Sequence, residues 1–276
     1  MGNAQPTNKT GRKVVSKKLE NAGKTNILSL REHGLDEIPV QVFEIKGMKT
    51  LDVSQNKIKN LGSRLAVLTE LKSLNVDQNL LVPGSLAPVA KLSKLQIFSA
   101  GGNQLGAASS SAPALPALPA SLKQIKLDHN SFSSFPPPLL LLPKLEKLDL
   151  SHNNLAAVPS EISSLVNLTE LNLDFNVVVS LPSSMGQLKK LKTLSLKNNQ
   201  LRASNTNFSD KNPQPIPASL FEDTPLIDLN LHNNPMTSTT LNEFEGYDKF
   251  LARREKIKTK DIYGGALTNL DVCGLK

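Results

Sequence analysis

The sequence predicts an α/β repeat solenoid of about nine coils, with a parallel β-sheet on its concave face and a helix capping its C-terminal end. Three observations carry this prediction. One pattern is written three times in succession, as LEKLDLSHNNL, LTELNLDFNVV and LKTLSLKNNQL, between Leu145 and Leu201. Its asparagines, Asn153, Asn176 and Asn199, are 23 residues apart, and a fixed short period is typical of repeat folds. Within each copy, leucines alternate with polar residues at the spacing of a short strand.

Each copy fits L-x-x-L-x-L-x-x-N-x-L, the signature of leucine-rich repeats, which stack into a horseshoe. One L-x-L strand cannot bury its leucines alone, but stacked coils bury them in a continuous core. The turn after each strand leaves backbone groups without partners, and an asparagine side chain can both donate to and accept from them. We therefore predict a structural ladder formed by Asn56, Asn79, Asn103, Asn130, Asn153, Asn176, Asn199 and Asn234.

The chain before the repeats divides into a tail and a cap. Residues 1–13 are polar and basic, and we expect them to be disordered. Residues 14–24 are predicted to form an N-terminal cap, an amphipathic helix that covers the open first coil. Its apolar residues have helical spacing and are Val14, Val15, Leu19 and Ala22.

The repeat array is predicted to span residues 25–240, with two insertions. Residues 106–119 are rich in Ala, Ser and Pro and lengthen one period to 27, whereas residues 202–215 are rich in Asn, Ser and Pro and lengthen another to 35. Both interrupt the chain outside the strand pattern, so we expect loops on the side away from the strands. The first insertion has an alternative interpretation as a proline-rich docking segment.

Residues 241–260 change to helical spacing and predict one C-terminal capping helix. Its apolar stripe consists of Leu241, Phe244, Tyr247, Leu251 and, less regularly spaced, Phe250. Residues 261–276 contain three glycines and no clear period, so we expect a loose tail.

The net charge of +8 lies mostly outside the array. Residues 1–24 carry six bases and one acid, whereas residues 25–242 carry 19 bases and 17 acids. A nucleic-acid-binding surface needs clustered bases, usually with stacking aromatic rings. RNA binding, one of the alternatives, therefore has no support in the array, and no nucleic-acid partner is expected.

Cys273 is the only cysteine, so an intrachain disulfide is impossible. Extracellular arrays of this type are usually closed by cysteine-bridged caps. No apolar run is long enough for a signal peptide or a membrane span. We therefore expect a cytoplasmic protein.

The N-terminus leaves two interpretations open. Met1-Gly2 begins like an N-myristoylation signal, but the sixth position is Pro6 instead of Ser or Thr, with Thr7 beyond it. Acylation of Gly2 together with the basic residues that follow would hold the protein peripherally on a membrane. The alternative is a solubilising tail without a lipid.

The two ends of the chain carry a more specific resemblance. KTNILSLREHGLDEIP (Lys24–Pro39) and EGYDKFLARREK (Glu245–Lys256) resemble the family of leucine-rich repeat-containing protein 57, which also begins Met-Gly-Asn. The resemblance covers roughly residues 14–260 and implies an intracellular binding scaffold without a defined reaction. The period also resembles Ras-group and phosphatase-regulating leucine-rich repeat proteins, which implies an alternative role as adaptor of a small GTPase or a protein phosphatase in signalling.

The strand residues that face away from the leucines line the concave face. They include eight acids and four bases, which favours a protein partner with a basic or mixed patch. The predicted partner-binding residues are Asp52, Asp77, Lys126, Asp128, Lys147, Asp149, Glu170, Asp174, Phe175, Lys197 and Asp228. Phe175 either anchors a partner or packs on its neighbours, and opposite charges in adjacent coils, such as Lys126, Asp149 and Glu170, can pair with one another.

No sequence feature indicates catalysis. The chain lacks a phosphate-binding Gly-Lys-Ser/Thr loop, H-E-x-x-H and a nucleophile elbow, which disfavours an enzyme, the remaining alternative. His129 and His152 occupy equivalent places but have no third ligand, so a zinc site is not expected. We predict a monomeric, non-catalytic protein–protein interaction scaffold with no metal and no cofactor.

Overall fold

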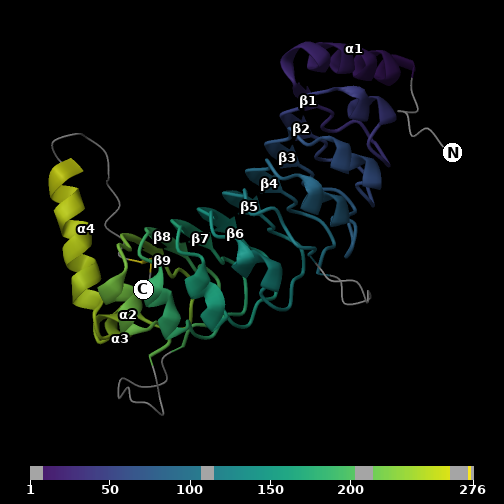
Figure 1. Cartoon of the computed structure of the whole chain (residues 1–276). Helices are drawn as coiled ribbons and strands as arrows, with labels where there is room; N and C mark the ends of the chain where they lie inside the picture. Colours follow the sequence, from purple (N-terminus) through teal and green to yellow (C-terminus); the bar gives the residue numbers. More distant parts are fainter. Residues whose placement is uncertain (1–8, 107–114, 203–213, 262–272, 275–276) are drawn as a thin grey trace. The chain divides into compact units, whose positions relative to one another are not determined.

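In a computed structural model, the structure describes residues 9–106, 115–202, 214–261 and 273–274. These fall into two compact units, an N-terminal unit drawn from Met1–Phe132 and Pro136–Leu145 and a C-terminal unit drawn from Ser133–Phe135 and Glu146–Lys276. The described residues form nine parallel strands whose order in the sheet is their order in the chain (Figure 1). The N-terminal unit contains β1 (Ile27–Ser29), β2 (Thr50–Asp52), β3 (Ser73–Asn75), β4 (Ile97–Ser99) and β5 (Gln124–Lys126). The C-terminal unit contains β6 (Lys147–Asp149), β7 (Glu170–Asn172), β8 (Thr193–Ser195) and β9 (Asp228–Asn230).

Each strand is three residues long and buries its middle residue, as the L-x-L pattern requires. The buried residues pair in register, Leu28 with Leu51, Leu51 with Leu74 and Leu74 with Phe98 in the N-terminal unit. In the C-terminal unit, Leu148 pairs with Leu171, Leu171 with Leu194 and Leu194 with Leu229. A slip by one residue would turn these side chains to the solvent, so the apolar core fixes the register. The predicted leucine-rich repeat solenoid is confirmed.

The chain returns from the strands through short 3-10 helices that close the other side of the core. They are η1 (Val40–Glu44), η2 (Ser63–Val67), η3 (Ala87–Lys91) and η4 (Pro137–Leu141) in the N-terminal unit, and η5 (Ser160–Ser164) and η6 (Ser183–Gln187) in the C-terminal unit. Pro39, Pro136, Pro159 and Pro182 precede four of them. Proline fixes φ near the helical value and lacks an N–H, so it can begin a helix but cannot extend a ladder. Each 3-10 helix turns an apolar residue into the core, for example Leu65 or Ile162.

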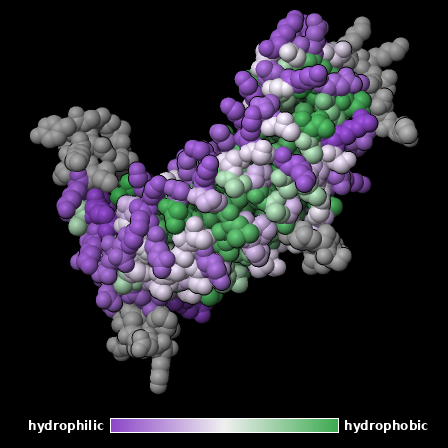
Figure 2. All heavy atoms as spheres, viewed as in Figure 1, coloured by the Kyte–Doolittle hydropathy of each residue, from purple (hydrophilic) through white to green (hydrophobic). Residues whose placement is uncertain are grey.

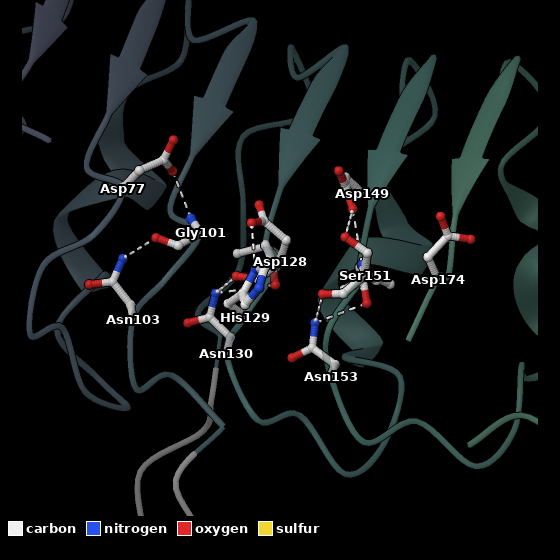
Figure 3. Close-up of polar contacts among 12 residues, drawn as sticks. Asp77, Gly101, Asn103, Asp128, His129, Asn130, Asp149, Ser151, Asn153 and Asp174 are labelled. Atoms are coloured by element: carbon white, nitrogen blue, oxygen red, sulfur yellow. Dashed lines mark hydrogen bonds and ion pairs between the residues drawn. The ribbon is translucent and has the colours of Figure 1, made fainter. Parts of the chain in front are cut away.

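The asparagines after the strands form a ladder of buried amides. The Nδ2 of Asn79 donates to the carbonyl of its own Val76 and to Val53 in the preceding coil, while its Oδ1 accepts from the N–H of Ile58. Asn176 repeats this arrangement with Leu173, Leu150 and Leu155. Figure 3 shows the amides of Asn103 and Asn130 in the same place after neighbouring strands of the N-terminal unit. Buried polar groups of the turns are thereby paired without water.

Helix α1 (Lys9–Thr25) covers the open first coil (Figure 1). It begins inside the segment 1–13 that was expected to be disordered, so that boundary was wrong. Val15 and Ala22 are buried as predicted, but Val14 is exposed, because only one stripe of a helix can face the core. In the view of Figure 2, the outward surfaces of α1 and α4 carry mainly hydrophilic side chains.

The C-terminal cap consists of two helices instead of the predicted single helix 241–260. Helix α3 (Ser238–Asn242) ends before Gly246, and α4 (Tyr247–Asp261) begins after it. Gly246 has φ +80°, and a Cβ there would lie 2.7 Å from the Cγ of Glu222, so the chain bends at a position where a side chain is excluded. Phe250, not the half-buried Leu251, completes the apolar stripe and packs with Tyr247 and Phe221. Phe221 belongs to α2 (Ala218–Asp223), which takes the place of a 3-10 helix and was not predicted.

The predicted loose tail 261–276 is also partly ordered. Asp261 ends α4, and further on Cys273 is buried. The carbonyl of Cys273 accepts a hydrogen bond of 2.9 Å from the N–H of Leu231, as Asn230 accepts one from Leu196. The backbone of Cys273 therefore occupies the place of a next strand beside β9. The two predicted insertions lie mostly outside the described residues, but Leu115 and Pro215 at their ends are buried.

Replacing Asn176 by Ala tests the ladder. The variant removes at least three hydrogen bonds, leaves the N–H of Leu155 without a partner and takes one donor each from the carbonyls of Leu150 and Leu173, so the free energy of unfolding should fall on the order of 2–4 kcal/mol. Asn154→Ala, at an exposed asparagine of the neighbouring coil, should change it by less than about 0.5 kcal/mol. Urea denaturation followed by circular dichroism measures both, and equal midpoints for the two variants would contradict the structural role of the ladder.

Candidate functional site

The outward strand face is the side of each strand opposite the buried leucines, together with the residues that directly follow the strand. In the N-terminal unit its centre is a small-residue site at Gly101, which Asp77 and Asp128 flank (Figure 3). Asp77 Oδ1 accepts hydrogen bonds from the Ser99 hydroxyl at 2.6 Å and from the Gly101 N–H at 2.7 Å. A Cβ on residue 101 would lie 2.4 Å from Asp128 Oδ1, so only glycine lets the Asp128 carboxylate approach the backbone there.

Burial perturbs the carboxylate of Asp77. Desolvation raises the pKa of Asp77 above its ordinary value, and the nearby charge of Asp128 acts in the same direction. The hydrogen bonds from Ser99 and Gly101 and the charge of Lys126 oppose this rise in the pKa. Asp77 is therefore a structural carboxylate that holds two coils together, and the burial that this requires removes part of its hydration.

The outward strand face of the C-terminal unit carries one ion pair and two anchored carboxylates. Lys147 Nζ lies 2.6 Å from Glu170 Oε1 on the adjacent strand, with both side chains about half exposed. Asp149 Oδ1 accepts from the N–H and the hydroxyl of Ser151 (Figure 3). Asp174 Oδ1 accepts from the Ser195 hydroxyl at 2.6 Å and from the backbone N–H of Lys197 at 2.7 Å. These acids keep their charge on the face, but their positions are fixed by the fold.

Phe175 is both packed and exposed. Its ring stacks on that of His152 with centroids 4.1 Å apart and an interplanar angle of 13°, and Lys197 Nζ lies 5.6 Å from its centroid. The side chain nevertheless remains 40% exposed. Phe175 therefore packs on its neighbours, as one interpretation of the sequence held, and is still exposed enough to contact a partner, as the other held.

The remaining predicted residues differ in whether they are exposed or bonded to other groups of the protein. Lys126 and Asp228 are exposed, at the end of β5 and the start of β9. Asp52 accepts from the N–H of Ser54, which ties it to its own turn. Asp128 lies 3.0 Å from His129 Nδ1. The face thus offers exposed charges beside charges that are committed to the fold.

The sequence interpretation missed the apolar part of the surface. Ile27 and Ile97 begin β1 and β4 on the outward strand face and are exposed. Val177 and Val179 follow Phe175 in the turn after β7 and are exposed as well. Val177 and Val179 alternate with the buried Val178, and this alternation could have indicated their exposure. A run of three valines is, however, also typical of a fully buried strand, so the sequence alone does not distinguish the two cases.

The described residues hold no group of three or more His, Cys, Asp or Glu side chains that could bind a metal ion. Burial raises the pKa of the Cys273 thiol to about 11, so the reactive thiolate is scarce at neutral pH. Within the parts of the chain that the structure describes, no helix is long and apolar enough to cross a membrane. Gly2 lies outside the described residues.

Comparisons with known proteins agree with this architecture. Residues 120–178 match the family model described as "Leucine rich repeat". An internalin, InlF of Listeria monocytogenes, is 24% identical with a TM-score of 0.63, over 83% of this chain and 61% of the internalin. The ectodomain of the receptor kinase GASSHO1/SCHENGEN3 of Arabidopsis thaliana is 28% identical with a TM-score of 0.53, over 80% of this chain and 29% of the ectodomain. Both solved chains are thus longer than the part that this protein matches.

No curated protein matches the sequence. The repeat pattern, the strand register and the matched family model together make the chain a leucine-rich repeat protein. The fold is commonly a protein-interaction module, so its function must be inferred from its surface.

Asp77→Asn tests the role of this half-buried carboxylate. Because the folded-state pKa of Asp77 is raised, the unfolded chain loses its proton first as the pH rises, and the folded state loses stability relative to it. The free energy of unfolding of Asp77→Asn should therefore increase relative to wild type between about pH 3 and pH 6. Ser73→Ala, which keeps the carboxylate, should follow the wild-type pH trend. Urea titrations at several pH values measure this, and a constant difference for Asp77→Asn would refute the assignment.

Proposed function

We propose that this protein is a non-catalytic protein-interaction scaffold that binds its partner through the outward strand face. The main support is that the polar groups of this face are held in place by the fold itself, such as Asp77 by Gly101 and Asp174 by Lys197. A surface whose side chains are already ordered loses little conformational entropy on binding. The solved array of the Arabidopsis receptor kinase is in complex with Casparian Strip Integrity Factor 2, which supports a binding role for a related array.

The charge of the face favours a partner with a basic or mixed patch. In the C-terminal unit, Lys147 and Glu170 neutralise each other, which leaves the three acids Asp149, Asp174 and Asp228 against the single base Lys197. In the N-terminal unit, Asp52, Asp77 and Asp128 outnumber Lys126 on the outward side of β2 to β5 and at the residues that directly follow these strands. A surplus of fixed negative charge steers positively charged partners and selects against acidic ones.

The double variant Glu170→Lys, Asp228→Lys should weaken binding of the main protein partner by at least about tenfold, because it reverses two charges on the outward strand face. The control double variant Glu161→Lys, Asp223→Lys makes the same charge change in η5 and α2, on the returning side of the same unit. Quantitative co-precipitation with mass spectrometry compares the three proteins. If the strand-face variant and the control retain the same partners equally well, binding does not use this face.

A narrower role follows from the resemblance to leucine-rich repeat-containing protein 57 and to the regulators of Ras-group GTPases and phosphatases. It would make the protein a cytoplasmic adaptor of a small GTPase or a protein phosphatase. The support for this role is the likeness of Lys24–Pro39 and Glu245–Lys256, which here form the N-terminal coil and the α4 cap. The identity of the partner lost by the strand-face variant tests this adaptor role, since the role requires that partner to be a small GTPase or a protein phosphatase.

Membrane attachment through acylated Gly2 is the second part of this proposal. A single acyl chain binds a membrane only marginally, and Lys17 and Lys24, exposed on α1, would add attraction to anionic lipids. Gly2→Ala should move the membrane-bound fraction to the soluble fraction and abolish labelling by a myristate analogue. Gly23→Ala, at an exposed glycine whose added Cβ meets no neighbour within 4 Å, is the matched control. If Gly2→Ala divides between the membrane and soluble fractions as wild type does, the protein is not held on membranes by acylation of Gly2.

A further inference from the structure

The coil that begins with β7 carries an exposed apolar patch, defined as Phe175, Val177 and Val179. Their side chains are 40%, 38% and 55% exposed, while Val178 between them is completely buried. The three exposed residues lie in the turn after the strand, next to the outward strand face. Contiguous exposed apolar side chains on a soluble protein are typical of interaction sites.

The backbone under the patch is held by both neighbouring coils. The N–H of Val177 donates to the carbonyl of Leu155 at 3.0 Å, and the carbonyl of Val178 accepts from Gln200 at 2.9 Å. The N–H of Val178 donates to Oδ1 of the ladder residue Asn199. The patch is therefore presented by a fixed backbone, and its apolar side chains lose little freedom on contact with a partner.

The ring of Phe175 is fixed as well. His152 from the preceding coil stacks on it, and Lys197 from the following coil places its ammonium over the ring. Aromatic side chains are enriched at protein interfaces, and a ring that is already held in place loses little freedom when a partner packs on it.

The patch is specific to this coil. At the three equivalent positions, the described neighbouring and N-terminal coils carry at least one polar residue or glycine. In the N-terminal coils from β2 on, these sets are Gln55, Lys57 and Lys59; Gln78, Leu80 and Val82; Gly102, Gln104 and Gly106; and His129, Ser131 and Ser133. In the coils on either side of the patch they are His152, Asn154 and Ala156, and Asn198, Gln200 and Arg202. The leucine core and the ladder do not require apolar side chains here, so folding does not explain them.

The charged side chains that flank the patch from the following coil are positive. Lys197 and Arg202 belong to the following coil, and none of the nine positions in the coils of β6, β7 and β8 carries a carboxylate. Asp174, next to Phe175 in the chain, directs its Oδ1 to Ser195 and to the backbone of Lys197. An incoming carboxylate would therefore meet cations beside the apolar surface.

We propose that this patch is a second docking site, distinct in chemistry from the acidic strand face, for a protein segment that combines apolar side chains with acidic residues. The apolar side chains pack on Phe175, Val177 and Val179, and a carboxylate pairs with Lys197 or Arg202. The inference rests on the proposed scaffold function and extends it, because one partner or two could then engage surfaces of opposite charge on one unit. A membrane is the less suitable occupant, since three side chains offer little apolar area to insert.

A peptide selection on the full-length protein tests this proposal without a known partner. A random peptide library is selected on wild type and counter-selected on Phe175→Asn, Val177→Gln, Val179→Ala, whose new residues all occur at equivalent positions of adjacent coils. Enriched peptides should carry apolar residues with a net negative charge. Synthetic copies should bind the triple variant about 30-fold more weakly and Lys197→Glu at least about threefold more weakly. Val82→Ser, at an exposed valine of the N-terminal unit, should bind like wild type.

The outcomes separate this site from the strand face. The double variant Glu170→Lys, Asp228→Lys should keep binding the selected peptides even where it loses its protein partner. The proposal is overturned if no peptide discriminates wild type from the triple variant, or if the discriminating peptides are basic. It is also overturned if wild type co-sediments with phosphatidylserine vesicles and the triple variant does not, because the patch would then be a membrane contact. If the patch proposal fails but wild type still binds a partner through the outward strand face, the proposed scaffold function is unaffected.

Discussion

The asparagine ladder is the interaction on which the rest of the structure depends. A coil of this kind must turn immediately after a three-residue strand, and the turn directs backbone N–H and C=O groups into an interior built of leucine. A buried group without a partner costs about 1–3 kcal/mol, so a stack of such turns would not be stable. One amide side chain, such as that of Asn79, joins its own turn to the carbonyl of the coil before it and accepts from that coil's return. The core and the stacking therefore depend on the same side chain.

The ladder also explains why so much of the outward strand face is structural. Once each turn is fixed, the side chains beside it are close enough to bind neighbouring backbone, and Asp77 and Asp174 do so one coil away. These residues look like binding residues in the sequence because they are polar and face outward. Their hydrogen bonds to the next coil assign them a second role that alternation alone does not reveal. Several of the charges that the face offers are thus fixed by the fold rather than flexible.

Sequence reasoning succeeded where a residue's environment repeats and was wrong where it does not. The nine strands, their register and the ladder follow from a period, because every coil solves the same burial problem. The ends have no such repetition. Helix α1 extends back to Lys9, and Gly246 divides the C-terminal cap. Cys273 lies beside β9 because its carbonyl accepts a hydrogen bond from Leu231. Phe250 replaced Leu251 in the core because the bend at Gly246 sets the phase of α4.

The sequence by itself determined the class of fold, the buried leucines and the asparagine column, since these depend on residue type and spacing alone. Only the tertiary structure decided which outward residues are free. It showed Lys147 paired with Glu170, Asp174 hydrogen-bonded to Ser195, and Phe175 stacked on His152 yet exposed beside Val177 and Val179. The physical reason is that these contacts join coils about 23 residues apart. Whether two such side chains meet depends on the stacking of whole coils, which no local pattern records.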